Sequence, residues 1–374
     1  MNSHPIHAIM REACGREFTG AVARVEHRGR LVFERAYGET RADALARAVY
    51  CDTLFDLASL TKLFVATLAL QAVAGGVLQL DEPLTSVIPE WRDTERAAVT
   101  LRMLLAHNSG MDSGADYRQI LDENVERFAL DAPSLAPPGE RVIYSDLGFI
   151  ALGIALRRAT QTSLEGLARA AFPPPLQYRP PANVRLHTPA TEDDGWRGRV
   201  QGVVHDEKAY LMGGASGHAG LFGTAADVAR LTGCYLAASV RRPQRRSHRA
   251  ASPLLPSALA REAVAEQAHD PVLRRGLGWA LKTNDGNSCG RAMSASSFGH
   301  TGFVGTCVWA DPERDLQGVL LTNAVYFGRN SAPEPSPTLR QRFYEAIVDG
   351  CHPEPAGGRH PDPVGGCHPE PVEG

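Results

Sequence analysis

The segment DLASLTKLFVATLALQAVAGG, Asp56–Gly76, places a serine and a lysine at the start of a run that is otherwise apolar. The length of this run predicts a buried helix over Leu57–Ala74. Lysine is rare in the chain, which has three lysines (Lys62, Lys208 and Lys282) among its 39 basic residues. A lysine in apolar surroundings can lose its proton, whereas an arginine cannot. Lys62 at the entrance of this helix therefore indicates chemistry rather than a surface charge.

Ser59 and Lys62 are one helical turn apart, so their side chains lie on the same face of the predicted helix. In the first turn the backbone N–H of Ser59 lacks a helical partner, and the helix dipole favours negative charge at this end. A lysine that has lost its proton can act as the base for the serine hydroxyl. The structural alternative makes Ser59 an N-cap and Lys62 a surface side chain that extends to solvent.

A second candidate lies in PPGERVIYSDLGFIALGIAL, where Tyr144, Ser145 and Asp146 stand directly before an apolar helix predicted from Leu147. A tyrosine and an aspartate at such a junction can direct a phenol and a carboxylate into a cleft. The alternative is a half-buried tyrosine, with Ser145 or Asp146 capping the helix.

A third candidate is FGHTGFVGT, in which small residues flank His300, Thr301 and Gly302 on a predicted strand. Glycines within a strand often mark a place where a ligand or another backbone comes close. The alternative is the rim of a strand with an exposed histidine.

The order of the predicted elements indicates an α/β (α+β) fold. Apolar and polar residues alternate about Arg28-Gly29, which predicts a β-hairpin over Gly20–Gly38. Helices are predicted between 57 and 172, and a long ordered loop over 173–200. Further predictions are strands over Gly276–Leu281, Gly299–Glu313 and Leu316–Tyr326, and a helix over Thr338–Gly350. We therefore expect an antiparallel sheet formed by N- and C-terminal strands, flanked by helices, with an inserted all-helical subdomain.

The motifs Ser-x-x-Lys, Tyr-Ser-Asp and His-Thr-Gly occur in that order, and with them the chain resembles the serine β-lactamase/DD-peptidase-like superfamily. It is most similar to the class C β-lactamase, esterase and D-aminopeptidase relatives. The stretches LLAHNSGM (Leu104–Met111), VVHDEKAYLMGGASGHAGLFGTAADVARL (Val203–Leu231) and GLGW (Gly276–Trp279) also resemble this family. The resemblance covers about residues 18–349 and implies a β-lactamase/transpeptidase-like fold, as one serine hydrolase domain over 1–350.

The resemblance also implies catalytic roles. Ser59 is expected to be the nucleophile that forms an acyl-enzyme, with Lys62 as its proton partner and Tyr144 passing the proton to the leaving group. Whether Lys62 or Tyr144 is the base stays open, as it does across the superfamily. The backbone N–H groups of Ser59 and Phe303 are expected to form the oxyanion hole.

The residues expected to bind substrate, again by resemblance, are Asp146, His300, Thr301, Gly302 and His218. His300 would flank the cleft opposite Tyr144, bind a substrate carboxylate or assist proton transfer, and His218 would line the pocket wall. No cofactor and no metal are expected at this site.

Two positions depart from the family pattern and affect the expected substrate. His300 stands where most β-lactamases have a lysine, and a partly charged imidazole holds a carboxylate less firmly than an ammonium does. Asp146 stands where asparagine is usual, so an amide donor is lost and a negative charge near Lys62 favours the protonated amine. If Asp146 and Lys62 lie close together, Tyr144 becomes the better base. Both changes favour a carboxylic ester or a small amide over penicillins.

Other functions stay open as alternatives. One is a β-lactamase or DD-carboxypeptidase acting on penicillins or cell-wall peptides. Another, from a different class, is a non-catalytic ligand-sensing module. Because the first forty residues contain no secretory signal, we expect a cytoplasmic protein, which disfavours a role on cell-wall peptides.

The partner expected from the resemblance is a small-molecule ester or amide substrate, and composition indicates neither nucleic acid nor a membrane as a further partner. The net charge is −3, and the basic stretch Ser239–Ser252 has no interleaved aromatic residue, so nucleic acid is not expected as a partner. The longest apolar run, Leu63–Val73, is too short to span a bilayer. Seven scattered cysteines without a Cys-x-x-Cys pair predict neither a disulfide framework nor a zinc site. The oligomeric state is not predicted.

The end of the chain differs in kind. Residues 351–374 are three copies of an eight-residue unit, CHPEPAGG, RHPDPVGG and CHPEPVEG. Such units contain too little apolar surface to offset the entropy lost on ordering, so we expect a disordered extension.

Overall fold

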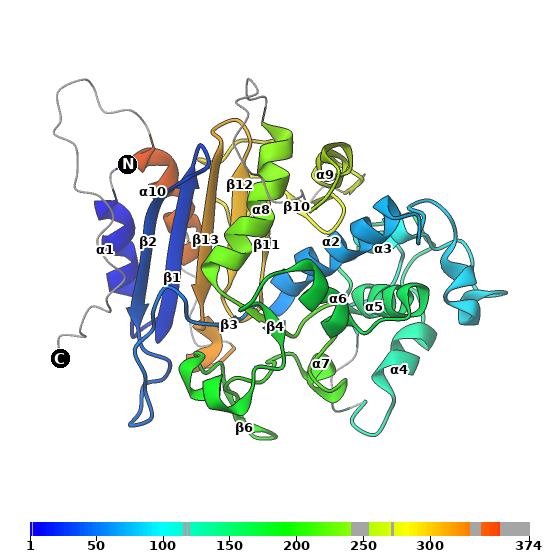
Figure 1. Ribbon diagram of the computed structural model, residues 1–374, viewed down its shortest axis with the longest axis horizontal. Coiled ribbons are helices and arrows are strands. Elements are labelled where there is room, and N and C mark those ends of the chain that lie inside the picture. Colours follow the sequence, from blue (N-terminus) through cyan, green and yellow to red (C-terminus); the bar gives the residue numbers. More distant parts are fainter. Residues whose placement is uncertain are drawn as a thin grey trace.

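The computed structural model of the chain describes residues 1, 3–114, 118, 120–240, 254–270, 273–329 and 338–351. It places a β-sheet with its covering helices beside a separate group of helices (Figure 1). Most of the basic stretch Ser239–Ser252 and nearly all of the repeat segment 351–374 lie outside the described residues, so the expectations for them stay predictions. No helix within the described ranges has the length and apolar character needed to cross a membrane.

The main sheet has eight antiparallel strands in the order β2-β1-β13-β12-β11-β10-β9-β8. They are β1 (Gly20–His27), β2 (Arg30–Gly38), β8 (Ala268–His269), β9 (Arg274–Arg275), β10 (Ala280–Leu281), β11 (Phe298–Thr301), β12 (Cys307–Asp311) and β13 (Leu316–Thr322). Strand β1 pairs with β13, from Ala21 opposite Thr322 to His27 opposite Leu316. The predicted sheet built from both parts of the chain is therefore confirmed.

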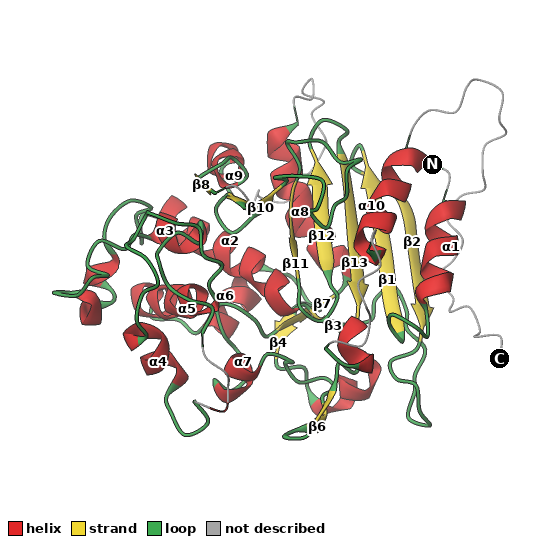
Figure 2. Ribbon diagram, turned by 180° about the vertical axis from the view of Figure 1, so that it is seen from behind, coloured by secondary structure: helices red, strands yellow, loops and turns green. Residues whose placement is uncertain are grey.

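The sheet is covered on both faces because its central strands are apolar throughout. Every residue of β12 and β13 is buried. Helix α8 (Ala225–Ser239) packs on β1, β12 and β13 from one side, and α10 (Leu339–Gly350) packs on β13 and on α1 (His4–Ala13) from the other (Figures 1 and 2). Helix α10 is the helix predicted over Thr338–Gly350.

The helices between residues 61 and 171 form a group on the side of the molecule away from β2 (Figure 2). They are α2 (Thr61–Ala74), α3 (Leu101–Leu105), α4 (Val125–Asp131), α5 (Asp146–Thr160) and α6 (Leu164–Ala171). Helix α2 packs on α5 and α6, and each of its residues from 61 to 70 is buried. A helix that is apolar on all sides belongs in a core, as its sequence predicts. Its start lies at the boundary with the sheet, where η1 (Ala58–Leu60) contacts β11.

The start of the predicted Leu57–Ala74 helix differs from expectation. Residues Ala58–Leu60 form the 3₁₀ turn η1, and the α-helix begins only at Thr61. Ala58 has a φ of 46°, which lies outside the right-handed helical region. Ser59 is therefore part of a tight turn in front of the helix.

The predicted strand Gly276–Leu281 is mostly a turn. Only its last two residues belong to β10, because the N–H of Gly276 bonds to the carbonyl of Trp279 at 2.8 Å and closes a tight loop. Gly278 has a φ of 84°, a conformation that favours glycine. The loop connects β9 to β10.

The predicted strand Gly299–Glu313 is divided into β11 and β12. The N–H of Gly302 bonds to the carbonyl of Thr306 at 2.7 Å and forms a turn between the two strands. The division matters for function, because it moves Phe303 from a strand to the tip of this turn. The last predicted strand ends at Thr322, and a 3₁₀ turn, η6 (Ala324–Phe327), follows.

The remaining elements are short. A second sheet has the strand order β3 (Phe55–Asp56), β7 (Leu221–Gly223) and β4 (Gln177–Tyr178), and β5 (Asp193–Asp194) pairs with β6 (Gly198–Arg199). The others are η2 (Leu84–Ser86), η3 (Pro89–Trp91), η5 (Ala182–His187), α7 (Glu207–Leu211) and α9 (Ser257–Ala263). The 173–200 segment, predicted as a loop, thus contains three short strands and one 3₁₀ helix.

Candidate active site

All three sequence motifs border one cavity of about 810 Å³. Its lining includes Ser59 from η1, Tyr144 and Asp146 from the start of α5, and His300 and Phe303 from β11 and the turn that follows it. The fold therefore brings together side chains that are far apart in sequence.

Ser59 is held in its turn by the buried carboxylate of Asp56. One oxygen of this carboxylate accepts a hydrogen bond from the N–H of Ala58 at 2.8 Å, and the other accepts from the N–H of His205 at 2.7 Å. The left-handed backbone of Ala58, with a φ of 46°, is unfavourable for a residue other than glycine. The two bonds to Asp56 hold this conformation, which fixes Ser59 at the cavity wall.

The side chain of Lys62 is completely buried, so the surface alternative is wrong. Its Nζ donates to Ser59 Oγ at 2.9 Å and to the carbonyl of His218 at 3.0 Å, and it lies 2.9 Å from Asp146 Oδ1. The N-cap position of α2 is occupied by Leu60 and has no side-chain capping bond, so Ser59 is not its cap. The Lys62 ammonium thus has three acceptors, one of which is the serine.

Tyr144, which lies just before helix α5, contacts the same oxygen of Ser59. Its hydroxyl donates to Ser59 Oγ at 2.9 Å. The ring packs on His107, with ring centres 4.7 Å apart, and Lys62 Nζ lies 5.0 Å from the centre of the tyrosine ring. Both predicted proton partners therefore contact one hydroxyl.

Ser145, and not Asp146, caps helix α5. Ser145 Oγ accepts from the N–H of Gly148 at 2.8 Å and donates to the carbonyl of Asp112 at 2.6 Å. The capping alternative is thus correct for Ser145 and wrong for Asp146. Asp146, in the first turn, points its carboxylate at Lys62 instead.

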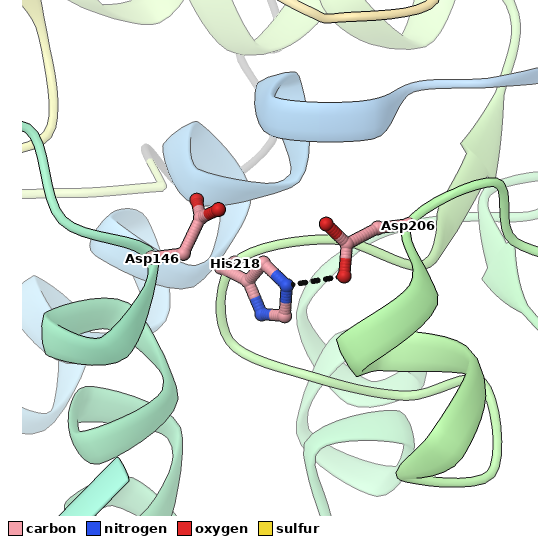
Figure 3. Close-up of side chains that lie close together, drawn as sticks. All are labelled: Asp146, Asp206 and His218. Carbon is pink, nitrogen blue, oxygen red and sulfur yellow. Dashed lines mark hydrogen bonds and ion pairs between the residues drawn. The ribbon is translucent and has the colours of Figure 1, made fainter. Parts of the chain in front are cut away.

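Asp146 belongs to a chain of charged groups along the cavity wall. Its second oxygen lies 3.4 Å from Lys208 Nζ, which is in turn 3.9 Å from Asp206 Oδ2. The other oxygen of Asp206 lies 2.6 Å from Nε2 of the buried His218. Figure 3 shows His218 between the two aspartates. The charges therefore alternate in sign from Lys62 to Asp206.

Asp146, Asp206 and His218 offer three potential metal-ligand atoms within 4.8 Å of one another. The ammonium groups of Lys62 and Lys208 are already paired with these carboxylates. A metal ion would have to lie beside two positive charges, which electrostatic repulsion disfavours. These residues fit an ion-pair network better than a metal centre.

These neighbouring charges set the protonation states of Lys62 and Asp146, which lie next to Ser59. Burial alone would lower the pKa of Lys62, but Asp146 and Tyr144 outweigh it and raise the pKa above its ordinary value. Burial alone would raise the pKa of Asp146, but Lys62, His218 and Lys208 outweigh it and lower that pKa. Lys62 is therefore an ammonium and Asp146 a carboxylate at neutral pH.

The backbone N–H of Ser59 is not used by the turn that contains it. The hydrogen bonds of η1 come from the N–H groups of Leu60 and Thr61, which bond to the carbonyls of Leu57 and Ala58. The Ser59 N–H makes no hydrogen bond within this turn, and it lies at the start of the helical segment, where a helix favours negative charge.

The turn after β11 is fixed against the segment that carries Ser59. Thr306 Oγ1 donates to the carbonyl of Leu57 at 3.2 Å. A Cβ added to Gly302 would lie 2.1 Å from Thr306 Oγ1 and 2.9 Å from that same carbonyl, so only glycine fits. The N–H of Phe303 has no backbone partner in the described turns and loops. The turn thus brings a second backbone donor close to Ser59.

His300 is buried and neutral, which corrects two expectations. It is 3% exposed, so it is not an exposed histidine at a strand rim. Burial, together with the positive charges of Arg275 and Lys62, lowers its pKa to about 3. Its Nδ1 lies 2.7 Å from the carbonyl of Thr301, so in the neutral ring Nδ1 carries the proton. The ring is therefore uncharged at neutral pH rather than partly charged.

Arg275 of β9 and Lys208 of α7 also border the cavity, and neither was predicted. The scarcity of lysine is a signal that could have identified Lys208. The third lysine, Lys282, donates to the carbonyls of Arg291 and Met293 and has a structural role. Arg275 carries no comparable signal, because arginine is common in this sequence.

The chain has curated relatives across most of its length. It is 30% identical over 353 residues to the N-acetylmuramyl-L-alanine amidase of Bacillus subtilis (strain 168), covering 82% of this chain and 77% of that protein. It is 31% identical over 364 residues to Esterase EstB of Burkholderia gladioli, covering 84% of this chain and 88% of that protein. The first is named an amidase and the second an esterase.

Solved structures have the same fold. One is EstCE1, a hydrolase with promiscuous acyltransferase activity, with a TM-score of 0.70 and 19% identity, covering 91% of this chain and 98% of that one. Another is a class C beta lactamase from Rhodobacter sphaeroides, with a TM-score of 0.70 and 17% identity, covering 93% of this chain and 98% of that one. At such identities the likeness shows the fold alone.

The family model for Beta-lactamase matches residues 7–335, a range that contains all three motifs. The resemblance inferred from the motifs is confirmed by this match and by the relatives at 30% and 31% identity. The chain therefore belongs to the Beta-lactamase family.

Proposed function

We propose that the protein is a serine hydrolase that acts through an acyl-enzyme on a carboxylic ester or a small amide. One observation carries the proposal: Lys62 Nζ and Tyr144 Oη each lie 2.9 Å from Ser59 Oγ. A serine hydroxyl is a weak nucleophile unless a neighbouring group takes its proton, and here two candidates are in hydrogen-bond contact with it.

In this proposal Tyr144 is the base. A neutral Lys62 could donate to Asp146 and to the His218 carbonyl and accept the serine proton on its lone pair, but the Asp146 charge favours the ammonium. To act as the base, Tyr144 must first release its own hydroxyl proton to solvent, and the phenolate then takes the Ser59 proton as Ser59 Oγ attacks the substrate carbonyl carbon. The Lys62 ammonium, 5.0 Å from the tyrosine ring centre, stabilises the negative charge on the phenolate.

The attack places a negative charge on the former carbonyl oxygen. The backbone N–H groups of Ser59 and Phe303 would donate to it, and one such donor lowers the barrier by about 3 kcal/mol. Tyr144 then gives its proton to the leaving oxygen or nitrogen as the bond from carbon to the leaving group breaks. A water molecule attacks the acyl-enzyme, Tyr144 accepts its proton, and Ser59 regains a proton as the acid is released.

The substrate class follows from the charges around the cavity. The neutral His300 supplies no ammonium at the position where most β-lactamases have lysine, and Asp146 supplies no amide donor. Both features support an ester or small amide rather than a penicillin as the substrate. The names of two relatives, Esterase EstB and the Bacillus subtilis amidase, correspond to the ester and the amide of this class.

Turnover of a substrate panel tests the proposal. The panel contains p-nitrophenyl acetate and butyrate, D-alanine p-nitroanilide and a chromogenic cephalosporin, each assayed with wild type, Ser59→Ala and Lys62→Met. We expect hydrolysis of the short esters by wild type alone, with the cephalosporin slow or refused. Rapid cephalosporin hydrolysis would favour the β-lactamase alternative. No turnover of any compound would favour a ligand-sensing module.

A further inference from the structure

Arg340 connects helix α10 to the turn that carries Phe303. It is the second residue of α10, and it lines the cavity. Its Nη2 donates to the carbonyl of Gly302 at 2.8 Å and to the carbonyl of Thr306 at 3.3 Å. The residues matched to the family end at 335, before Arg340, so the match assigns it no role. A side chain from α10 therefore holds the turn between β11 and β12.

The carbonyl of Gly302 belongs to the same peptide group as the N–H of Phe303, the second donor of the expected oxyanion hole. This carbonyl also accepts from the N–H of Gly305 at 3.1 Å. With Arg340 it has two donors, one for each lone pair of the oxygen. The peptide is trans, so its C=O and N–H point in opposite directions in one rigid plane. Donors that fix the oxygen therefore also fix the direction of the Phe303 N–H.

The positive charge of Arg340 adds an electronic effect to this geometry. The peptide C–N bond has partial double-bond character, so a cation at the oxygen withdraws electron density from the nitrogen and makes the N–H a stronger donor. A hydrogen bond from an ionised donor is about twice as strong as one between neutral groups. The neutral N–H of Gly305 already closes the turn. The charge of Arg340 therefore points to a role beyond holding the backbone.

The next arginine of the same helix has a different role. Arg342 pairs with Glu12 at 3.2 Å and with Glu17 at 2.8 Å, and so connects α10 to α1 and the residues that follow it. Positions two residues apart do not share a helix face, so Arg342 does not contact the turn at Gly302. Substitution of Arg342 removes the same charge from the same helix and is the matched control for Arg340.

We propose that Arg340 is a positioning residue for catalysis: its guanidinium orients and polarises the Gly302–Phe303 peptide, so that the Phe303 N–H stabilises the negative charge that develops on the substrate carbonyl oxygen. The inference rests on the proposed function and adds a residue to it. In this role Arg340 acts through the peptide and does not touch the substrate. Its loss therefore affects the transition state more than it affects substrate binding.

The kinetics of p-nitrophenyl acetate hydrolysis test the effect on catalysis. We expect Arg340→Met to lower kcat by about 10- to 100-fold, with KM within about twofold of the wild-type value. In Arg340→Lys, which keeps the charge, kcat recovers in part, and Arg342→Met keeps the wild-type kcat. Arg340→Gln takes the place of Arg340→Met if the latter does not fold. A raised KM with an unchanged kcat would contradict the inference, because it would show that Arg340 binds the substrate itself.

An NMR measurement tests the action on the peptide without any turnover. Protein labelled with carbonyl-13C glycine and 15N phenylalanine gives carbonyl-filtered amide signals from Gly–Phe peptides, of which the sequence has two, Gly148–Phe149 and Gly302–Phe303. Phe303→Leu identifies the Phe303 signal by its loss. In Arg340→Met we expect the 15N signal of Phe303 to move upfield, since less electron density is withdrawn from the nitrogen. The Phe149 signal should stay in place as the internal control.

The two measurements together separate this inference from the proposed function. If wild type hydrolyses esters but the Phe303 signal does not move in Arg340→Met, the proposed function stands and the inference is wrong. If the signal moves but wild type hydrolyses no ester, the action of Arg340 on the peptide stands and the proposed function is wrong. A moved signal together with a lowered kcat and an unchanged KM supports both.

Discussion

At the scale of single residues, the proposed mechanism makes the charge of Asp146 decide how Ser59 is activated. Its oxygens lie 2.9 Å from Lys62 Nζ and 3.4 Å from Lys208 Nζ, so it favours the protonated form of Lys62. In Asp146→Asn this effect is lost and the pKa of Lys62 falls. Because the pKa of Lys62 falls, the acidic limb of kcat/KM should move to lower pH.

The matched control for this prediction removes a positive charge. Lys208→Met removes a positive charge that repels the Lys62 ammonium, so the acidic limb should move in the opposite direction, to higher pH, and by a smaller amount. The measurement is the pH dependence of p-nitrophenyl acetate hydrolysis for the three proteins. Shifts in the same direction for both variants would show that the network does not control the base.

The buried His300 should make the fold sensitive to acid. Its pKa is about 3 in the folded protein, against an ordinary value of 6.5, so between these values the unfolded chain binds more protons. Stability is therefore complete above pH 6.5 and is lost as the pH falls toward 3. His300→Gln should reduce the fall in the free energy of unfolding between pH 7.5 and 4.5 by about 2 kcal/mol.

Urea denaturation at the two pH values measures this effect. The exposed His187 supplies the control, because His187→Gln changes a histidine that is already in solvent. An unchanged pH dependence in His300→Gln would mean that the ring can be protonated in the folded state.

At the scale of elements, the turn between β11 and β12 carries one half of the expected oxyanion hole. A Cβ on Gly302 would collide with Thr306 Oγ1 and the carbonyl of Leu57, so Gly302→Ala must displace the turn and the N–H of Phe303 with it. We expect kcat for p-nitrophenyl acetate to fall by about 10²- to 10³-fold.

The control for this substitution is Gly195→Ala, in the turn between β5 and β6. An added Cβ there meets nothing within 4 Å, so activity should be preserved. Circular dichroism of both variants shows whether the fold is kept. Full activity in a folded Gly302→Ala protein would contradict the role of the Phe303 N–H in the oxyanion hole.

The sequence allowed prediction of those parts of the site that lie in local motifs. Ser59 and Lys62 are three residues apart, so helical spacing alone suggests that their side chains act together, and Tyr144 and Asp146 lie within one short junction before a predicted helix. Arg275 approaches them only because β9 joins the far edge of the sheet, and no local pattern encodes that approach. The start of α2 could not be predicted either, because a carboxylate that holds Ala58 at positive φ is a tertiary effect.

At the scale of the whole molecule, the site depends on a sheet that joins distant parts of the chain. Asn323, just after β13, accepts from the N–H groups of Thr19 and Gly20 at 3.1 and 3.0 Å. It also donates to Thr19 Oγ1 at 2.8 Å and to the carbonyl of Ala190 at 2.7 Å. This buried side chain connects three segments separated by more than a hundred residues, which periodicity in the sequence cannot reveal.

Asn323→Ala should destabilise the protein by about 2 to 4 kcal/mol, because it leaves buried backbone donors without acceptors. The catalytic constants of the folded fraction should change little, since Asn323 does not line the cavity. The measurement is the midpoint of urea unfolding, with the exposed Asn183→Ala as the control expected to stay within about 0.5 kcal/mol of wild type. A stability equal to that of the control would contradict this role.

The proposed mechanism requires that the Ser59 hydroxyl is activated by its two proton partners and becomes acylated. Its most direct test is reaction of the whole protein with a fluorophosphonate, followed by intact mass and peptide mapping. We predict one adduct, on the peptide that contains Ser59, formed slowly by Tyr144→Phe and not formed by Ser59→Ala. An adduct at another residue, or equal labelling of wild type and Ser59→Ala, would contradict the claim.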